Sequence, residues 1–126
     1  MVDDLARRVM TAAIEVHRIL GPGLLESLYE GALCVELTRA NIPFEQQARV
    51  RIRYKEHDIG EAKLDLLVSQ QLVVELKTVE AVLPVPLAQL LSYLKIKRLR
   101  LGLLINFNVP ILAHGMKRVV HTPSPP

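Results

Sequence analysis

The stretch LDLLVSQQLVVELKTVE, residues 64–80, determines how this chain folds. Two apolar runs lie on either side of the short polar turn SQQ, and this pattern predicts an antiparallel pair of strands. Asp65, Glu75 and Lys77 interrupt the apolar runs. Because a charge that loses its water without gaining a partner is strongly destabilising, these three residues need a partner or a function.

Strand alternation places Asp65 close to Glu75. If SQQ is a three-residue turn, the two carboxylates lie directly opposite each other, with Cβ atoms about 4.5–5.5 Å apart. Carboxylates at that distance repel each other, whereas a divalent cation such as Mg²⁺, which takes oxygen ligands, would turn the repulsion into a binding site. Lys77 projects from the same face two residues later, where it could hold a water molecule or a phosphate oxygen.

The same residues permit a second interpretation without a metal. Lys63 would pair with Glu75, and Lys77 with Asp65, in a salt-bridged hairpin with a solvated face. An Asp followed by Glu-x-Lys is a weakly specific pattern, so the hairpin alone leaves both interpretations open.

The rest of the chain predicts an α/β fold with a mixed sheet. The GPG breaker, residues 21–23, separates two helices, and Asp3 and Asp4 are expected to cap the first. The run LGLLINF, residues 101–107, is apolar on both faces, as a central strand should be. Since a helix is expected between it and the strand of Glu75, the two strands should be parallel, with a right-handed crossover. The expected elements are a helix ending at GPG, a helix over 24–40, strands over 44–55, 61–68 and 72–79, a helix over 87–97, a strand over 101–107 and a short edge strand over 115–120.

The composition of the 126-residue chain, 50% hydrophobic and 23% charged, predicts one globular domain over residues 1–120 and a disordered tail over 121–126. The single cysteine, Cys34, fits a reducing cytosol, and the apolar runs are too short to span a bilayer. We therefore expect a cytoplasmic protein without a membrane partner. The net charge of +3 is a weak indication of an anionic partner.

Basic side chains alternate along the strand expected over residues 44–55. Arg49, Arg51 and Arg53 share one face of it. They could follow a phosphate backbone, whose recognition needs charge and no sequence code. They could equally be the solvated face of an edge strand, where charges prevent aggregation.

Apolar residues recur at helical spacing in the second helix. Leu25, Leu28, Tyr29 and Leu33 are expected to form its buried side. Tyr29 is therefore expected in the core rather than in contact with a substrate.

A wider pattern of residues resembles a known nuclease superfamily. The pattern consists, in chain order, of Glu26, Asp65, Glu75, Lys77, Gln89 and Tyr93. An acidic residue on a helix, an Asp, a Glu-x-Lys strand and a Gln and Tyr four residues apart on the next helix resemble the PD-(D/E)XK superfamily and its RecB-like branch. The segment GLLESLY, residues 23–29, is similar to the signature of the GxxExxY protein family. GEAKLDLLV, VVELKTV, AQLLSYLK and GLLINFNVP resemble that family's other blocks in the same order, and the resemblance covers residues 5–120.

The resemblance implies a restriction-endonuclease-like fold, an αβββαβ core whose mixed β-sheet is flanked by helices, with an extra N-terminal helix. It implies a site for Mg²⁺ or Mn²⁺ formed by Glu26, Asp65 and Glu75, with the Leu76 carbonyl as a further ligand. Lys77 would activate or orient the attacking water.

The same resemblance implies a function. Gln89 and Tyr93 would support the site or touch the substrate backbone. The expected activity is Mg²⁺-dependent hydrolysis of DNA phosphodiester bonds with little sequence specificity, and other nucleic acids are alternative substrates. The chain departs from the family at Pro86, where the family often has histidine.

Two alternatives belong to other classes. A nuclease-fold protein with weak or no turnover could act as a nucleic-acid-binding or protein-interaction module. A pure assembly module could form a homodimer through the N-terminal helix. Metal-dependent cleavage distinguishes the nuclease from the first alternative, and DNA binding distinguishes both from the second.

Overall fold

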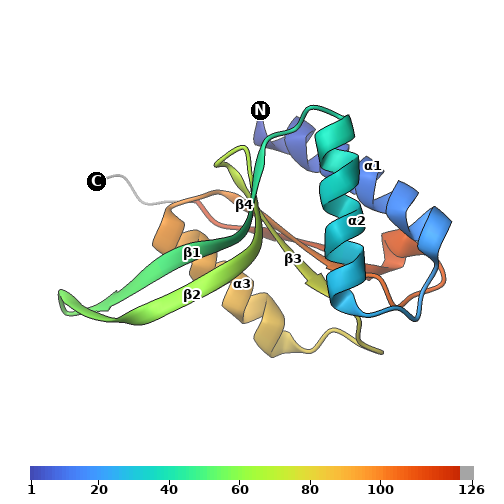
Figure 1. Cartoon of the computed structure of the whole chain (residues 1–126). Coiled ribbons are helices and arrows are strands. Elements are labelled where there is room, and N and C mark those ends of the chain that lie inside the picture. The colour runs from blue at the N-terminus through green and yellow to red at the C-terminus, as the bar shows by residue number, and fades with distance from the viewer. Residues whose placement is uncertain (123–126) are drawn as a thin grey trace.

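Five strands form a mixed sheet with helices on both faces (Figure 1). The computed structural model describes residues 1–122. The strand order is β1-β2-β3-β4-β5, with β3 and β4 parallel and the other neighbouring pairs antiparallel. The elements are α1 (Val2–Leu20), α2 (Glu26–Arg39), β1 (Phe44–Tyr54), β2 (His57–Val68), β3 (Leu72–Lys77), α3 (Pro84–Lys97), β4 (Leu101–Asn106), the 3₁₀ turn η1 (Leu112–Gly115) and β5 (Met116–Val120). The α/β fold expected from the sequence is confirmed, with α1 as the extra helix and β5 as the edge strand.

The turn between β2 and β3 has the expected three residues. Val68 lies opposite Leu72. Ser69 and Gln70 adopt φ angles of 52° and 56°, and the Gln71 N–H donates to the Val68 carbonyl at 3.0 Å. This tight turn sets which residues of the two strands face each other.

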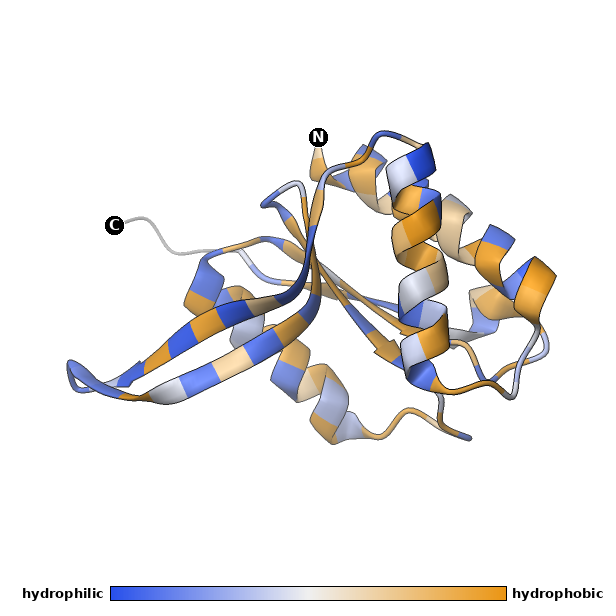
Figure 2. Cartoon of the chain, in the orientation of Figure 1, coloured by the Kyte–Doolittle hydropathy of each residue, from blue (hydrophilic) through white to orange (hydrophobic). Residues whose placement is uncertain are grey.

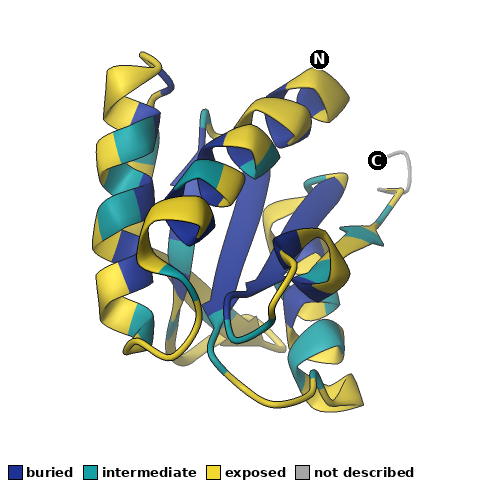
Figure 3. Cartoon of the chain, turned by 90° about the vertical axis from the view of Figure 1, so that its right-hand side faces the viewer, coloured by how far each residue is buried: buried dark blue, intermediate teal, exposed yellow. Residues whose placement is uncertain are grey.

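Each face of the sheet buries its own apolar cluster. Leu66 and Val74 pack beneath α1 and α2, whereas their neighbours Leu67 and Val73 pack beneath α3. Figure 3 shows that the helices turn their buried sides toward the strands and their exposed sides outward. Alternation between two covered faces explains why these strands are apolar almost throughout.

Leu90 of helix α3 packs against Gly102 of β4. All residues of β4 are buried, as the apolar run predicts. A Cβ added to Gly102 would lie 2.7 Å from Leu90 Cδ1, so a larger residue there would require the Leu90 side chain to move. Leu90 and Leu94 pack α3, the helix that carries Tyr93, on this face of the sheet.

Two helix starts differ from the sequence prediction. Helix α1 begins at Val2, so Asp3 and Asp4 lie in its first turn and make no capping hydrogen bond. Acidic residues are favourable there too, because the first turn carries the positive end of the helix dipole. Helix α3 begins at Pro84 rather than residue 87, because proline is tolerated in the first turn, where backbone N–H groups lack helical partners.

The buried side of α2 is narrower than predicted. Tyr29 and Leu33 are fully buried, but Leu25 and Leu28 are 72% and 52% exposed. Leu25 precedes the helix, which begins at Glu26. Leu25 and Leu28 therefore do not supply the apolar contacts that the spacing indicated, whereas Tyr29 does.

The outer parts of β1 and β2 form a two-stranded arm, residues 49–61, that extends away from the helices (Figure 1). Beyond Val50 the arm is exposed apart from the half-buried Ile52. Hydrophilic and hydrophobic residues alternate along it (Figure 2). The alternation gives the arm one polar face and one face of mixed polarity.

The chain is still hydrogen-bonded at residue 121, where the sequence predicted the start of a disordered tail. The His121 N–H donates to the Arg100 carbonyl at 2.8 Å, while residues 123–126 of the expected tail lie outside the described residues. Within residues 1–122, none of the helices is long and apolar enough to cross a membrane.

Candidate active site

The two strands of the central hairpin are joined by carboxylates where their backbone pairing ends. The ladder between β2 and β3 runs from Val68–Leu72 to Leu66–Val74. One residue further, the Asp65 N–H donates to Glu75 Oε2 at 2.7 Å. The Leu76 N–H donates to Asp65 Oδ2 at 2.8 Å. Asp65 and Glu75 therefore lie together, as the register predicts, and each binds the main chain of the opposite strand.

Burial makes these carboxylates hard to ionise. Glu75 is only 8% exposed, and burial, followed by the charge of Asp65, raises the pKa of Glu75 to about 8. Burial also raises the pKa of Asp65, although the hydrogen bond from Leu76 opposes the shift. Pairs of partly desolvated carboxylates are a feature of functional sites. Their mutual repulsion is offset when they bind a proton or a cation.

Glu26 opens α2 beside this pair. Burial, then the charge of Asp65, raises the pKa of Glu26, and Lys77 lowers it. The three predicted carboxylates thus lie within electrostatic range of one another and of one lysine.

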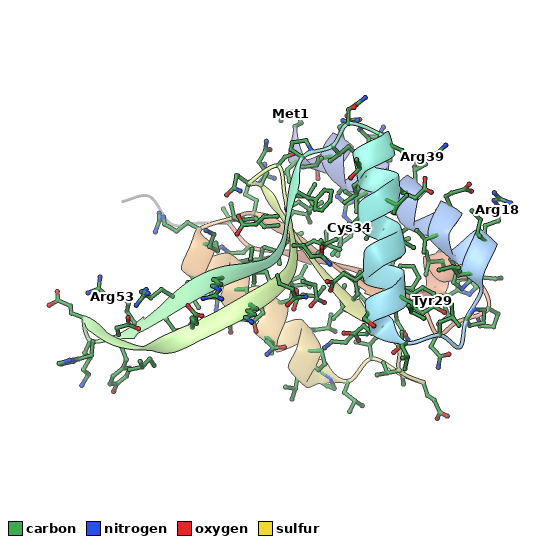
Figure 4. All side chains as sticks on the ribbon, in the orientation of Figure 1. Met1, Arg18, Tyr29, Cys34, Arg39 and Arg53 are labelled. Carbon is green, nitrogen blue, oxygen red and sulfur yellow. The ribbon has the colours of Figure 1, made fainter. Side chains whose placement is uncertain are left out.

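The loop before Glu26 is held by Tyr29. The Tyr29 hydroxyl donates to the Gly21 carbonyl and accepts from the Leu24 N–H at 3.2 Å. Its ring stacks on Phe107 at a centroid distance of 4.5 Å, and Figure 4 shows Tyr29 near the lower end of α2. Tyr29 is in the core, as predicted, and it also positions the turn from which Glu26 projects.

Lys77 is held at the end of β3. It pairs with Asn106 of β4, and its carbonyl accepts from the Phe107 N–H at 2.9 Å. The buried Asn106 side chain binds the N–H and carbonyl of Val79 at 3.1 and 2.7 Å. β3 therefore ends at Lys77 and not at residue 79, because the Asn106 side chain takes the place of the backbone hydrogen bonds of the sheet there. Asn106 was missed in the sequence, although a polar residue closing an apolar strand is a usable signal.

The salt-bridged hairpin is not what the structure contains. Lys77 lowers the pKa of Glu26, Asp65 and Glu75, but neither Lys77–Asp65 nor Lys63–Glu75 is among the ion pairs of residues 1–122. The carboxylates are bound by backbone N–H groups instead.

Helix α3 brings Tyr93 to the site. Burial, then the charges of Glu75 and Asp65, raises the pKa of Tyr93. Gln89 is exposed one turn earlier, and the half-buried Pro86 lies seven residues before Tyr93, on the same side of the helix. The structure thus brings Tyr93 near the carboxylates, while the Gln89 side chain makes no hydrogen bond within the described part of the chain.

The three arginines of the arm contact other groups of the arm. Arg49 pairs with Glu61 at 3.3 Å, and Arg51 pairs with Asp58. Arg53 donates to the Glu56 carbonyl at 3.1 Å, and Figure 4 shows it far out on the arm. Exposed pairs of this kind contribute only about 0–1 kcal/mol, so a phosphate could replace the acidic partners.

One buried acid beside the site was missed in the sequence. Glu30, one turn after Glu26, is 9% exposed and accepts from Gln46 Nε2 at 2.7 Å and Gln47 Nε2 at 2.9 Å. Gln47 Nε2 also lies 3.4 Å from Asp65 Oδ1. The sequence signal that could have identified Glu30 is its spacing of four residues from Glu26.

The donor set has the chemistry of a site for a hard divalent cation. Glu26, Asp65 and Glu75 supply oxygen ligands with raised pKa values, and one lysine does not neutralise them. Within residues 1–122, no three Asp, Glu, His or Cys side chains stand close enough together to hold one ion as they are placed. The side chains fit the ion by chemistry, and a shared ion would have to draw them together.

Comparison with family models gives a match over residues 3–119 to the model described as the PD-(D/E)XK nuclease superfamily. A search of curated proteins finds no match for the chain. The matched range covers every element from α1 to β5 except the first residue of α1 and the last of β5, and it includes Glu26, Glu30, Asp65 and Glu75.

Proposed function

This chain belongs to the PD-(D/E)XK nuclease superfamily, whose members generally use divalent metal ions, and we propose that it hydrolyses phosphodiester bonds of DNA at the site around Asp65 and Glu75. The observation that carries the proposal is the pair of carboxylates at the end of the β2–β3 ladder, each bound to the opposite backbone, with Lys77 beside them. This arrangement supports a nuclease rather than a salt-bridged hairpin.

We assign the metal ligands as Glu26, Asp65, Glu75 and the Leu76 carbonyl, with Mg²⁺ or Mn²⁺ as the ion. Such an ion, when bound, lowers the pKa of a water ligand and offsets charge on the phosphate. The Leu76 N–H keeps Asp65 oriented, and the hydrogen bond from Asp65 N–H does the same for Glu75. These hydrogen bonds reduce the conformational freedom that Asp65 and Glu75 would lose when an ion draws the ligands together.

Lys77 supplies a fixed positive charge next to the carboxylates. Its ammonium group would orient the attacking water and stabilise the charge that develops on the phosphate oxygens. Tyr93 and Gln89, on one side of α3, would contact the substrate backbone.

The arm would hold the nucleic acid beside the site. Arg49, Arg51 and Arg53 can exchange their exposed partners for phosphates, and such contacts carry no sequence information. We therefore expect little sequence specificity.

Pro86 supports a second candidate function. It lies on the side of α3 that carries Tyr93, at the place where the GxxExxY family often has histidine. A protein that keeps the fold and the arm but lacks a catalytic side chain there would bind nucleic acid without turnover. The narrower resemblance to the GxxExxY family, the cytoplasmic location and a homodimer through α1 stay predictions.

The test is incubation of the purified chain with plasmid DNA, single-stranded DNA and RNA in Mg²⁺, Mn²⁺ or EDTA. We expect DNA cleavage with metal that is lost in EDTA and in Lys77→Ala, and retained in the control Lys63→Ala. Undiminished cleavage by Lys77→Ala would remove the proposed mechanism. Metal-dependent DNA binding without cleavage would favour the second candidate, and cleavage of RNA alone would replace DNA as the substrate.

A further inference from the structure

A chain of side-chain contacts links α2 to Asp65 through β1. Glu30 of α2 accepts hydrogen bonds from Gln46 and Gln47, two neighbouring residues of β1. Of the two glutamines, Gln47 also contacts Asp65: its Nε2 lies 3.4 Å from Asp65 Oδ1. The contacts therefore connect three consecutive elements, α2, β1 and β2, through their side chains.

The backbone of Gln47 is strained in a way that serves this contact. Its φ is 52°, between the regular pairs Gln46–Leu66 and Ala48–Leu64. A non-glycine residue in this left-handed region is unfavourable and persists only where surrounding contacts hold it, commonly at functional sites. Here the conformation directs the amide into the space between Glu30 and Asp65.

The acid that anchors Gln47 is buried without a cation. Glu30 is 9% exposed, and both of its carboxylate oxygens are bound by glutamine amides. No ion pair of residues 1–122 includes Glu30. A buried carboxylate next to two others adds repulsion, so its placement there needs a compensating role.

On these contacts we propose that Glu30 and Gln47 are positioning residues for Asp65, and that Glu30 acts through Gln47. The inference rests on the metal site of the proposed function. Asp65 Oδ2 accepts from the Leu76 N–H at 2.8 Å and Oδ1 has the Gln47 amide at 3.4 Å, so the two contacts together orient the plane of the carboxylate. Each carboxylate oxygen has a second lone pair, which stays available to an ion.

Neighbouring glutamines offer a matched pair of variants. Gln47→Asn shortens the side chain that reaches Asp65, and asparagine tolerates the left-handed conformation. Gln46→Asn makes the same change in a residue that binds Glu30 but does not contact Asp65. The affinity for Mn²⁺, measured from thermal melts of the full chain at increasing Mn²⁺, should fall about 10–100-fold in Gln47→Asn and less than about threefold in Gln46→Asn.

The role of Glu30 is tested by a double-mutant cycle. Glu30→Gln keeps the shape but cannot accept two amide donors through its new –NH₂ group. If Glu30 acts through Gln47, the double variant should bind Mn²⁺ no more weakly than Gln47→Asn. Losses that add fully would overturn this pathway and assign Glu30 an independent charge effect.

The outcomes separate this inference from the proposed function. Equal Mn²⁺ affinities of Gln47→Asn and wild type would overturn the positioning role while leaving the metal site intact. A wild-type protein whose melting temperature ignores Mn²⁺ would remove the metal site, and the positioning role with it. If Gln47→Asn does not fold, unchanged affinity in Glu30→Gln would overturn the inference, and a loss of tenfold or more would support it.

Discussion

Asp65 and Glu75 each bind the backbone of the other's strand: Glu75 Oε2 accepts from the Asp65 N–H at 2.7 Å, and Asp65 Oδ2 accepts from the Leu76 N–H next to Glu75 at 2.8 Å. The two acids therefore close the hairpin where the backbone ladder ends. Their charges oppose each other, whereas their hydrogen bonds hold the strands together.

Neutralising Asp65 should not destabilise the metal-free protein. Asp65→Asn keeps an oxygen that can accept from the Leu76 N–H and removes the repulsion with Glu75. The free energy of unfolding in EDTA should be unchanged or higher by about 1 kcal/mol. The stabilisation by millimolar Mn²⁺, which grows as RT ln(1 + [L]/Kd) in the wild type, should disappear. Thermal melts of both proteins measure this, and a destabilised variant with a metal-insensitive wild type would contradict the metal site.

The raised pKa of Glu75 predicts a pH dependence of stability. The folded protein holds this proton up to about pH 8, whereas the unfolded chain releases it near 4.5. Stability from this group is therefore fully present below pH 4.5 and is lost as the pH rises toward 8. Urea unfolding in EDTA should show this decline in the wild type and a smaller one in Glu75→Gln. The same slope in both proteins would mean that Glu75 ionises normally.

The affinity for metal should show the opposite pH dependence. A ligand carboxylate must lose its proton before it binds an ion, so Mn²⁺ affinity should increase with pH up to about 8, where Glu75 titrates. Calorimetry in two buffers of different ionisation enthalpy would report the released proton. Binding without proton release near pH 6 would show that Glu75 is not a ligand.

Removing the Tyr29 hydroxyl should loosen the turn before Glu26. Tyr29→Phe keeps the stack on Phe107 but leaves the Gly21 carbonyl and the Leu24 N–H without their partner. We expect a loss of about 1–3 kcal/mol in the free energy of unfolding and weaker Mn²⁺ binding. Tyr54→Phe is the control, because Tyr54 is 60% exposed on the arm. Equal effects of the two substitutions would contradict a special role for Tyr29.

Loss of charge from the arm should weaken DNA binding and its salt dependence. Replacing Arg51 and Arg53 by alanine should lower the slope of log K against log salt by about one per lost phosphate contact. Arg18→Ala, which removes an exposed arginine that also pairs with an acid, is the control. An unchanged slope would show that these arginines form a solvated face and do not contact phosphates.

The sequence was sufficient to predict the parts of the site that depend on the register between β2 and β3. A three-residue turn and period-two alternation place Asp65 opposite Glu75, and both rules are local. The order of apolar runs likewise predicted β4 as a central parallel strand.

Contacts between distant polar residues could not be predicted in the same way. Glu30 and Gln47 meet only because α2 and β1 pack together, and no local pattern announces the strained φ of Gln47. The exposure of Leu25 and Leu28 depends on where α2 starts relative to the sheet, which periodicity does not encode. Local rules determine which residues share a strand face, while tertiary packing determines which of them touch.

The turn at residues 69–71 has a consequence for how the protein can change. Side chains of a strand alternate, so adding or deleting one residue between Val68 and Leu72 would shift β3 by one position and turn Glu75 toward α1 and α2. Such a change leaves every chemical group of the protein in place and still separates Glu75 from Asp65. Substitutions in this turn are compatible with inheritance of the site, whereas a change of its length that shifts β3 by one residue is not.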